Sequence, residues 1–220
     1  MEINHLRRLG AALALALVLF APTAQTHAQE VVAATLSEAE RATILRIEDY
    51  LNGVLTMEAR FLQISSNGNY AEGKMYLSRP GKMRLAYDPP VPVLIIVAKG
   101  NLIYVDKDLQ QVSYVNADDT PAGFLVREKI SLFGDDLIIT DFIQEAQTLR
   151  LSLARAEDPL EGALTLVLSD RPMQLKKWVV TDAQGVTTTV SLLGPRFGAK
   201  IDSELFVFLD PRTNNTWDKF

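Results

Sequence analysis

The sequence predicts a mainly β fold with a few helices, built on one curved antiparallel sheet. Apolar and polar residues alternate over many short segments, which is typical of strands with one buried face. Turns rich in Gly, Pro, Asn and Asp separate these segments at regular spacing, which favours a meander over βαβ units. A sheet of about eleven or twelve strands must curl or close. The two helical segments are too few to form a second layer, so we expect them to cover the mouth of an unclosed barrel.

The N-terminal segment has the organisation of a cleaved signal peptide. Arg7 and Arg8 give it a positive start, an apolar run follows, and Ala28 is a small residue suited to cleavage. The apolar run is too short to span a bilayer, which takes about 20 residues. We therefore expect a signal peptide at 1–28, a single domain at 29–220, and a soluble protein exported to the periplasm.

Composition excludes several classes of function for the expected mature chain. Both histidines, His5 and His27, lie in the expected signal peptide, and the sequence contains no cysteine. Catalytic groups and metal sites that need histidine or cysteine are therefore excluded, and so are disulfides. The formal net charge is −5 and no basic run occurs, so binding to nucleic acid or to an anionic membrane surface is disfavoured.

Carboxylate, lysine and tyrosine chemistry remains open, and paired carboxylates are the candidates for catalysis. Asp118-Asp119 and Asp135-Asp136 could act as the acid and base of a glycosidase. Both pairs lie in loop-like segments beside expected helix ends, where aspartate caps a helix or is solvated. The other acidic residues are dispersed, so no carboxylate metal site is predicted. We expect no enzyme activity, no metal and no cofactor.

A helix is predicted near the start of the mature chain. Residues 37–40 read Ser-Glu-Ala-Glu, which is a capping box, and Asn52-Gly53 ends the helix. Ile44, Ile47 and Leu51 fall on one side of it at helical spacing. Such an amphipathic helix needs an apolar surface to pack against.

A second, shorter helical segment begins at Thr120 and Pro121, as N-cap and first helical residue. It ends near Phe133-Gly134, and its length suits a lid. Its apolar members are Phe124, Leu125 and Ile130.

Strand-like alternation covers most of the remaining chain. Proline-rich residues 88–92 interrupt it, because proline cannot donate to a strand ladder. The expected strands cover residues 55–61, 71–77, 83–87, 94–98, 102–106, 111–115, 137–144, 148–156, 163–169, 175–181, 186–193 and 205–209.

Methionines and aliphatic residues share the faces of several expected strands. Flexible thioethers suit a surface that accepts variable apolar guests, but methionine also fills gaps in an ordinary core. The residue types alone leave both interpretations open. The residues concerned are Met57, Met75, Leu77, Met83, Leu85, Leu94 and Ile96.

Several collinear segments match a known family. Residues 73–87 read Gly-Lys-Met-Tyr-Leu-Ser-Arg-Pro-Gly-Lys-Met-Arg-Leu-Ala-Tyr, with Phe-Leu-Gln before them at 61–63 and Pro90 after them. Further matching positions are Gly100, Tyr104, Asp106, 111–112, Pro121, Leu125, Asp182, Gly185 and 206–208. In this order, over most of residues 38–211, the sequence resembles the outer-membrane lipoprotein carrier protein (LolA) family.

The resemblance implies both a fold and a function. Its fold is an unclosed barrel of about eleven strands, with a three-helix lid over an apolar cavity. Members of the family take lipoproteins from an inner-membrane ABC transporter, cross the periplasm, and pass them to an outer-membrane acceptor lipoprotein. The resemblance therefore predicts a monomeric chaperone that binds the acyl chains of lipoproteins.

The resemblance also assigns roles to residues. The family arginine that latches the lid matches Arg79. Strand positions that line the cavity are often aromatic in relatives and aliphatic here, and residues 210–213 lack the usual glycine after proline. The expected acyl cavity is lined by Met75, Leu77, Met83, Leu85, Leu94, Ile96 and Leu125.

Four other functions are alternatives to this one. The same fold could carry a glycolipid or another amphiphile, or it could serve as a lipoprotein-sensing regulatory module, which would call for a further partner-binding domain. An outer-membrane acceptor is disfavoured because the sequence has no lipobox cysteine. A carboxylate hydrolase would lose its activity on substitution of Asp118 or Asp135.

Overall fold

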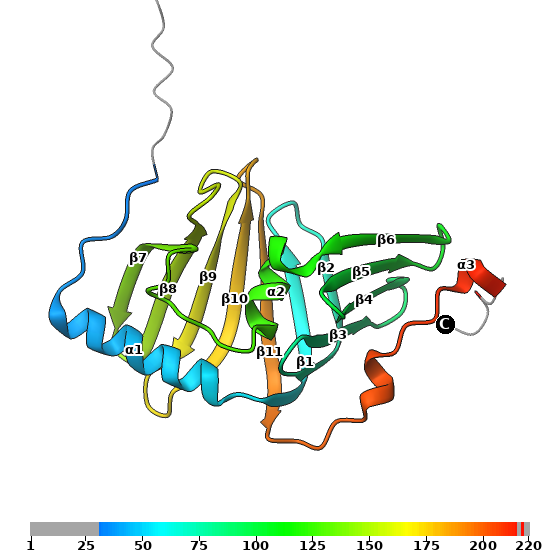
Figure 1. Ribbon diagram of the computed structural model, residues 1–220, viewed down its shortest axis with the longest axis horizontal. Coiled ribbons are helices and arrows are strands. Elements are labelled where there is room, and N and C mark those ends of the chain that lie inside the picture. The colour runs from blue at the N-terminus through cyan, green and yellow to red at the C-terminus, as the bar shows by residue number, and fades with distance from the viewer. Residues whose placement is uncertain (1–30, 215–216, 218–220) are drawn as a thin grey trace, which may run out of the picture. The chain divides into compact units, whose positions relative to one another are not determined.

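The computed structural model describes residues 31–214 and 217, and Figure 1 shows how their helices and strands are arranged. The expected signal peptide at 1–28 lies outside the described residues. Eleven antiparallel strands form one curved sheet, as predicted, in the order β6-β5-β4-β3-β2-β1-β11-β10-β9-β8-β7. The strands are β1 (Thr56–Ser65), β2 (Tyr70–Ser78), β3 (Lys82–Tyr87), β4 (Val93–Ala98), β5 (Asn101–Asp106), β6 (Gln111–Asn116), β7 (Leu137–Glu145), β8 (Thr148–Arg155), β9 (Gly162–Ser169), β10 (Gln174–Asp182) and β11 (Thr187–Phe197).

The two strands that follow one another at the middle of the chain lie at opposite edges of the sheet. The chain runs outward from β1 to β6, and then returns from β7 to β11, which pairs with β1. Because β6 and β7 do not pair, the barrel stays unclosed. Their connection must therefore cross the sheet, and it carries the short 3₁₀ helix η1 (Ala117–Asp119) and α2 (Pro121–Val126).

Helices α1 (Glu38–Gly53) and α2 lie on the same face of the sheet, which we call the inner face. The predicted capping box is present in α1: the Ser37 N–H donates to Glu40 Oε2 at 2.7 Å, and the Glu40 N–H donates to Ser37 Oγ at 3.3 Å. The Thr120 hydroxyl caps α2 by accepting from the Gly123 N–H at 3.1 Å. Local sequence signals therefore placed both helix starts correctly.

The C-terminal segment departs from the sequence prediction. No strand forms at 205–209; the chain instead makes the 3₁₀ helix η2 (Ser203–Phe206). Arg84 of β3 donates to Leu205 O at 3.0 Å, and Phe208 packs on a small apolar cluster of β4–β6 that faces away from α1 and α2. Because this segment crosses the outer face, it has no strand edge with which to pair.

The lid also differs from the three-helix lid that the resemblance implied. Helix α3 (Pro211–Asn214) belongs to the outer-face segment, where Arg212 donates to Val112 O at 3.2 Å. Within residues 31–214, two α-helices, α1 and α2, contribute to the inner core.

A glycine in β2 makes space for an aromatic ring in the inner core. Phe61 is fully buried and packs edge-on against Tyr87, with ring centroids 5.1 Å apart. A Cβ added at Gly73 would lie 2.7 Å from the Phe61 ring and 2.3 Å from Ala86 O. These distances are shorter than van der Waals contact, so this strand position requires glycine.

We therefore predict that Gly73→Ala lowers the free energy of unfolding by about 1–3 kcal/mol, because the core must shift to admit the methyl group. Gly53→Ala is the control, since a Cβ at Gly53 would meet no atom within 4 Å. Urea unfolding of both variants measures the difference. Equal midpoints for the two variants would contradict the assigned packing.

Candidate functional site

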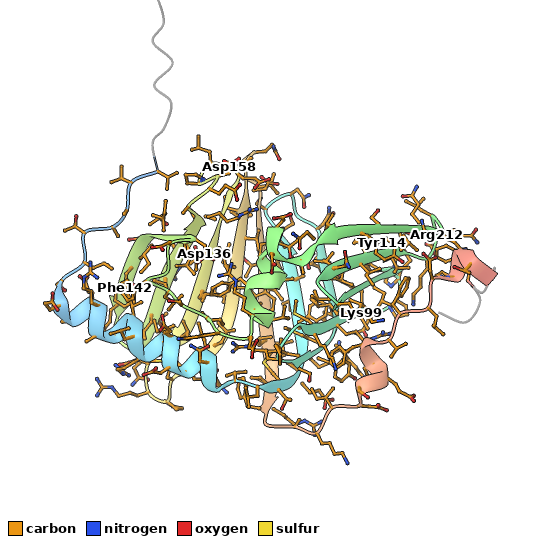
Figure 2. All side chains as sticks on the ribbon, viewed as in Figure 1. Lys99, Tyr114, Asp136, Phe142, Asp158 and Arg212 are labelled. Atoms are coloured by element: carbon orange, nitrogen blue, oxygen red, sulfur yellow. The ribbon has the colours of Figure 1, made fainter. Side chains whose placement is uncertain are left out.

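The inner face of the sheet is an apolar surface, to which β7–β10 contribute the largest share. Every second residue of a strand points to the same face. Leucines of β8 and β9 pair directly across the sheet: Leu151 with Leu166, and Leu153 with Leu164. Phe142 of β7 also contributes to this surface (Figure 2). The buried inner-face residues of these four strands are Ile139, Phe142, Leu149, Leu151, Leu153, Leu164, Leu166, Leu168, Leu175 and Trp178.

The two helices and the segment after α2 cover this surface. Their apolar side chains are buried and belong to the same core as the leucines of the sheet. We call α1, α2 and residues 127–134 the lid. Its buried apolar residues are Ile44, Ile47, Leu51, Phe124, Leu125, Val126, Ile130 and Leu132.

Around Arg79, the space between lid and sheet is almost full. One cavity of about 20 Å³ lies beside Arg79, Leu51 and Trp178. A site of this size holds about one water molecule. An aliphatic chain of many carbon atoms can therefore occupy this part of the interior only if the lid moves.

Most of the residues that the sequence assigned to an acyl cavity lie in this interior. Met75, Leu77 and Leu125 line the cavity beside Arg79. Met83 and Leu85 of β3 belong to the same buried core. Their contact with an acyl chain stays a prediction.

Two of the residues assigned to the acyl cavity, Leu94 and Ile96, lie on the outer face of the sheet. In the register of β3 and β4, Leu85 pairs with Ile95, whereas Ile96 pairs with Arg84. Leu94 and Ile96 therefore point to the outer face, where they form a separate cluster with β5, β6 and the C-terminal segment. The inner-face residues of β4 are Ile95 and Val97.

Sequence reasoning did not assign the part of the interior that comes from β7–β10. The alternation in 148–156 and 163–169 identified strands, and the leucines at every second position were visible. That alternation was the available signal. It identifies the residues of each face, but only the pairing of the strands shows that the leucine face lies under the lid.

Arg79, just beyond the end of β2, joins the parts of the lid. Its Nε donates to Arg127 O at 2.7 Å and its Nη2 donates to Glu128 O at 3.2 Å, both just after α2. Its Nη1 donates to Leu51 O and, at 3.4 Å, to Val54 O, at the end of α1. One guanidinium thus ties the C-terminal ends of both lid helices to the sheet.

The environment of Arg79 explains why a guanidinium suits this position. The side chain is 9% exposed, and burial lowers the pKa of Arg79 from its ordinary value. Arginine nevertheless stays charged in proteins. The last carbonyl groups of a helix lack partners within the helix and carry partial negative charge, so they compensate a buried cation. Among the described residues, no carboxylate lies within ion-pair distance of Arg79.

Two side chains of α1 hold the segment after α2. The Asn52 side chain donates to Ile130 O at 2.8 Å and accepts from the Ile130 N–H at 2.9 Å. Glu48 accepts from the Leu132 N–H at 2.6 Å. Asn52 Oδ1 also accepts from Arg79 Nη2 at 3.3 Å, so Arg79 and Asn52 together connect the parts of the lid. We call this pair the latch.

Comparison with known proteins identifies the family. The family model described as "Outer membrane lipoprotein carrier protein LolA" matches residues 52–209. This chain belongs to the LolA family. The match includes the whole sheet, the latch arginine and α2, and it leaves out most of α1.

Relatives match over most of their length. An outer-membrane lipoprotein carrier protein of Azotobacter vinelandii is 28% identical over 188 residues, which cover 80% of this chain and 87% of the relative. An uncharacterized protein of Rickettsia prowazekii is 23% identical over 164 residues, covering 74% and 75%. Among solved structures, a LolA superfamily protein of Nitrosomonas europaea aligns at 7% identity with a TM-score of 0.45, over 74% of this chain and 97% of that one.

In this LolA-family member, α1 is attached to the opposite half of the sheet from α2. Arg46 forms an ion pair with Asp170, in the β9–β10 turn, at 2.8 Å. The hydrogen bond from Arg46 lowers the pKa of Asp170, and a second one from Arg171 adds to the effect. The Tyr50 hydroxyl accepts from the Leu175 N–H at 3.0 Å. These contacts fix α1 on β9 and β10.

Two further properties bear on function. Within residues 31–214 and 217, no three histidine, cysteine or acidic side chains gather closely enough to hold a metal ion. No helix in the described part of the LolA-family chain is long and apolar enough to cross a membrane.

We predict that Arg79→Leu loosens the lid while the sheet stays folded. Loss of several hydrogen bonds from a charged donor costs about 2 kcal/mol or more. Amide exchange at Ile130 and Leu132 should therefore rise about thirtyfold. Hydrogen exchange followed by mass spectrometry or NMR measures this change.

Arg84→Leu is the matched control. It removes a partly buried guanidinium that also donates to a main-chain carbonyl, but on the outer face. It should leave exchange in residues 130–132 unchanged. Equal effects of the two variants would contradict the latch.

Proposed function

We propose that this chain is a periplasmic carrier of lipoproteins, which binds their acyl chains in the interior between sheet and lid. The observation that carries the proposal is an apolar interior whose lid is held by one arginine through main-chain carbonyls. Membership in the LolA family supports it, and relatives along most of the chain are named outer-membrane lipoprotein carrier proteins.

Acyl chains require such shielding in water. Burial of a methylene group is worth about 0.8 kcal/mol, so a chain of about fifteen methylenes gains on the order of 12 kcal/mol. A carrier that bound this strongly would not release its cargo. The closed lid opposes cargo binding. The free energy needed to open the lid is subtracted from the free energy gained by burying the acyl chains, so the observed affinity for cargo is lower.

Arg79 sets this balance in the proposed cycle. The empty protein is closed, with the guanidinium bonded to Leu51, Arg127 and Glu128. Cargo displaces the lid and occupies the space that Leu125 and Ile130 fill in the closed state. On release, the hydrogen bonds form again and favour the empty form.

The proposal includes the location and partners expected from the sequence. The signal peptide at 1–28 directs export to the periplasm. Loading comes from an inner-membrane lipoprotein-releasing ABC transporter, and delivery is to an acceptor lipoprotein of the outer membrane. The carrier acts as a monomer, without nucleic acid, cofactor or enzyme activity.

The direct test is to identify the cargo. The exported chain is purified from periplasm, and bound molecules are identified by mass spectrometry. Acylated lipoproteins are the expected result. Free glycolipids or other amphiphiles, without lipoproteins, would instead support the alternative cargo and reject this proposal.

We further predict that Arg79→Leu retains cargo but transfers it slowly, because the closed state no longer competes with bound acyl chains. Transfer of a lipoprotein from the loaded carrier to an acceptor measures release, with Arg84→Leu as the control. Wild-type transfer rates in Arg79→Leu would reject the role of the latch in release.

A further inference from the structure

A second, larger hollow lies where α2 faces β8–β10. It is a groove of about 240 Å³ between the segment 118–127 and the ends of these strands. Phe124, Leu153 and Leu164 line it, and all three also belong to the inner core. The groove is thus an exposed extension of the same apolar surface that the lid covers.

The groove is bridged weakly. Two exposed or partly exposed ion pairs join the lid segment to the sheet here: Asp119 of η1 with Arg155 of β8 at 3.4 Å, and Arg127 with Asp136, directly before β7, at 2.6 Å. Asp119 is 56% exposed and Arg155 is 35% exposed, and ion pairs between such exposed groups contribute little. On its other side, α2 is held by Arg79 and by the Gly81 N–H, which donates to Val126 O at 2.7 Å. The lid therefore separates most easily along the groove.

The rim of the groove is negatively charged. Its lining holds five carboxylates and two guanidiniums, an excess of three negative charges. Both guanidiniums already have carboxylate partners: Arg127 pairs with Asp136 at 2.6 Å, and Arg155 with Asp119 and Glu161. Asp158 stands at the end of the groove formed by the strand tips (Figure 2). The five carboxylates are Asp118, Asp119, Asp158, Glu161 and Asp182.

We propose that this groove is the mouth through which acyl chains pass, and that its carboxylates select acylated peptides without net negative charge. An acyl chain suits the apolar lining, while the rim attracts a cationic peptide and repels an anionic one. The inference rests on the proposed function and adds a charge preference for the part of the cargo that stays outside.

The test compares two synthetic lipopeptides with identical acyl groups, one ending in Ser-Lys-Lys-Lys-Lys and the other in Ser-Glu-Glu-Glu-Glu. Binding below their micelle concentration is followed by fluorescence of Trp178, which lies beside the inner cavity. The rim variant combines Asp118→Asn, Asp158→Asn and Glu161→Gln. The control variant makes the same change of charge at exposed sites outside the groove: Asp108→Asn, Asp141→Asn and Glu145→Gln.

The wild-type protein should bind the lysine lipopeptide about tenfold more tightly at low salt, because the rim concentrates cations near the mouth. The ratio should fall toward one in about 0.5 M salt, where charges are screened. It should also fall in the rim variant, but not in the control variant.

Three outcomes would overturn the inference, and they have different consequences for the proposed carrier function. If the wild type binds both lipopeptides equally, or if the rim variant keeps the wild-type ratio, the charge selection is rejected while the carrier function stands. If the wild type binds neither lipopeptide, the carrier function fails and the inference fails with it.

Discussion

An apolar face on an unclosed sheet is the constraint from which the rest of this structure follows. Buried residues run along the inner face from β3 to β7, and an apolar surface of this extent cannot remain in water. A closed barrel would cover it with its own strands. Here β6 and β7 lie at opposite edges, so the connection between them must cross the open side, and this connection became part of the lid.

The lid is divided between the two halves of the sheet. Helix α1 is fixed to β9 and β10 by Arg46 and Tyr50, whereas the segment of α2 is fixed to β2 and β3 through Arg79 and Gly81. The two parts meet at the latch formed by Arg79 and Asn52. This arrangement makes a strong junction at one side of α2 and a weakly bridged groove at the other. A lid built in this way can open on one side while it stays attached on the other.

The interactions that close the lid are suited to reversal. Hydrogen bonds from one cation to main-chain carbonyls are specific in direction, and water can replace each of them when they break. Around Arg79, the apolar part of the lid packs against the sheet with space for about one water molecule. The acyl chains of the proposed cargo would replace that packing with similar apolar contacts. The empty and loaded forms of such a carrier would therefore differ in free energy by less than the gain from burying a free acyl chain.

Periodicity and local capping signals were enough to predict the fold class and most of the local elements. Strand periodicity predicted twelve strands, of which eleven form. The capping box at Ser37 and the N-cap at Thr120 located the starts of both lid helices, because these signals depend on neighbours in the chain. Resemblance to the family pointed to Arg79, but its partners on α1 and after α2 lie far from it in sequence.

The identity of the apolar residues that face the interior depends on strand pairing. In β4 the run Leu94–Val97 is apolar at every position, because one side packs under the lid and the other under the C-terminal segment. A strand that is buried on both faces shows no apolar–polar alternation, so its sequence does not indicate which residues face the interior. The register with β3 shows that Leu94 and Ile96 lie on the outer face. The same holds for 205–209, whose alternation looks like a strand but which lies across a sheet face with no edge to join. A local pattern predicts which secondary structure a segment can form. The strands that surround the segment in the fold determine which surface its side chains cover.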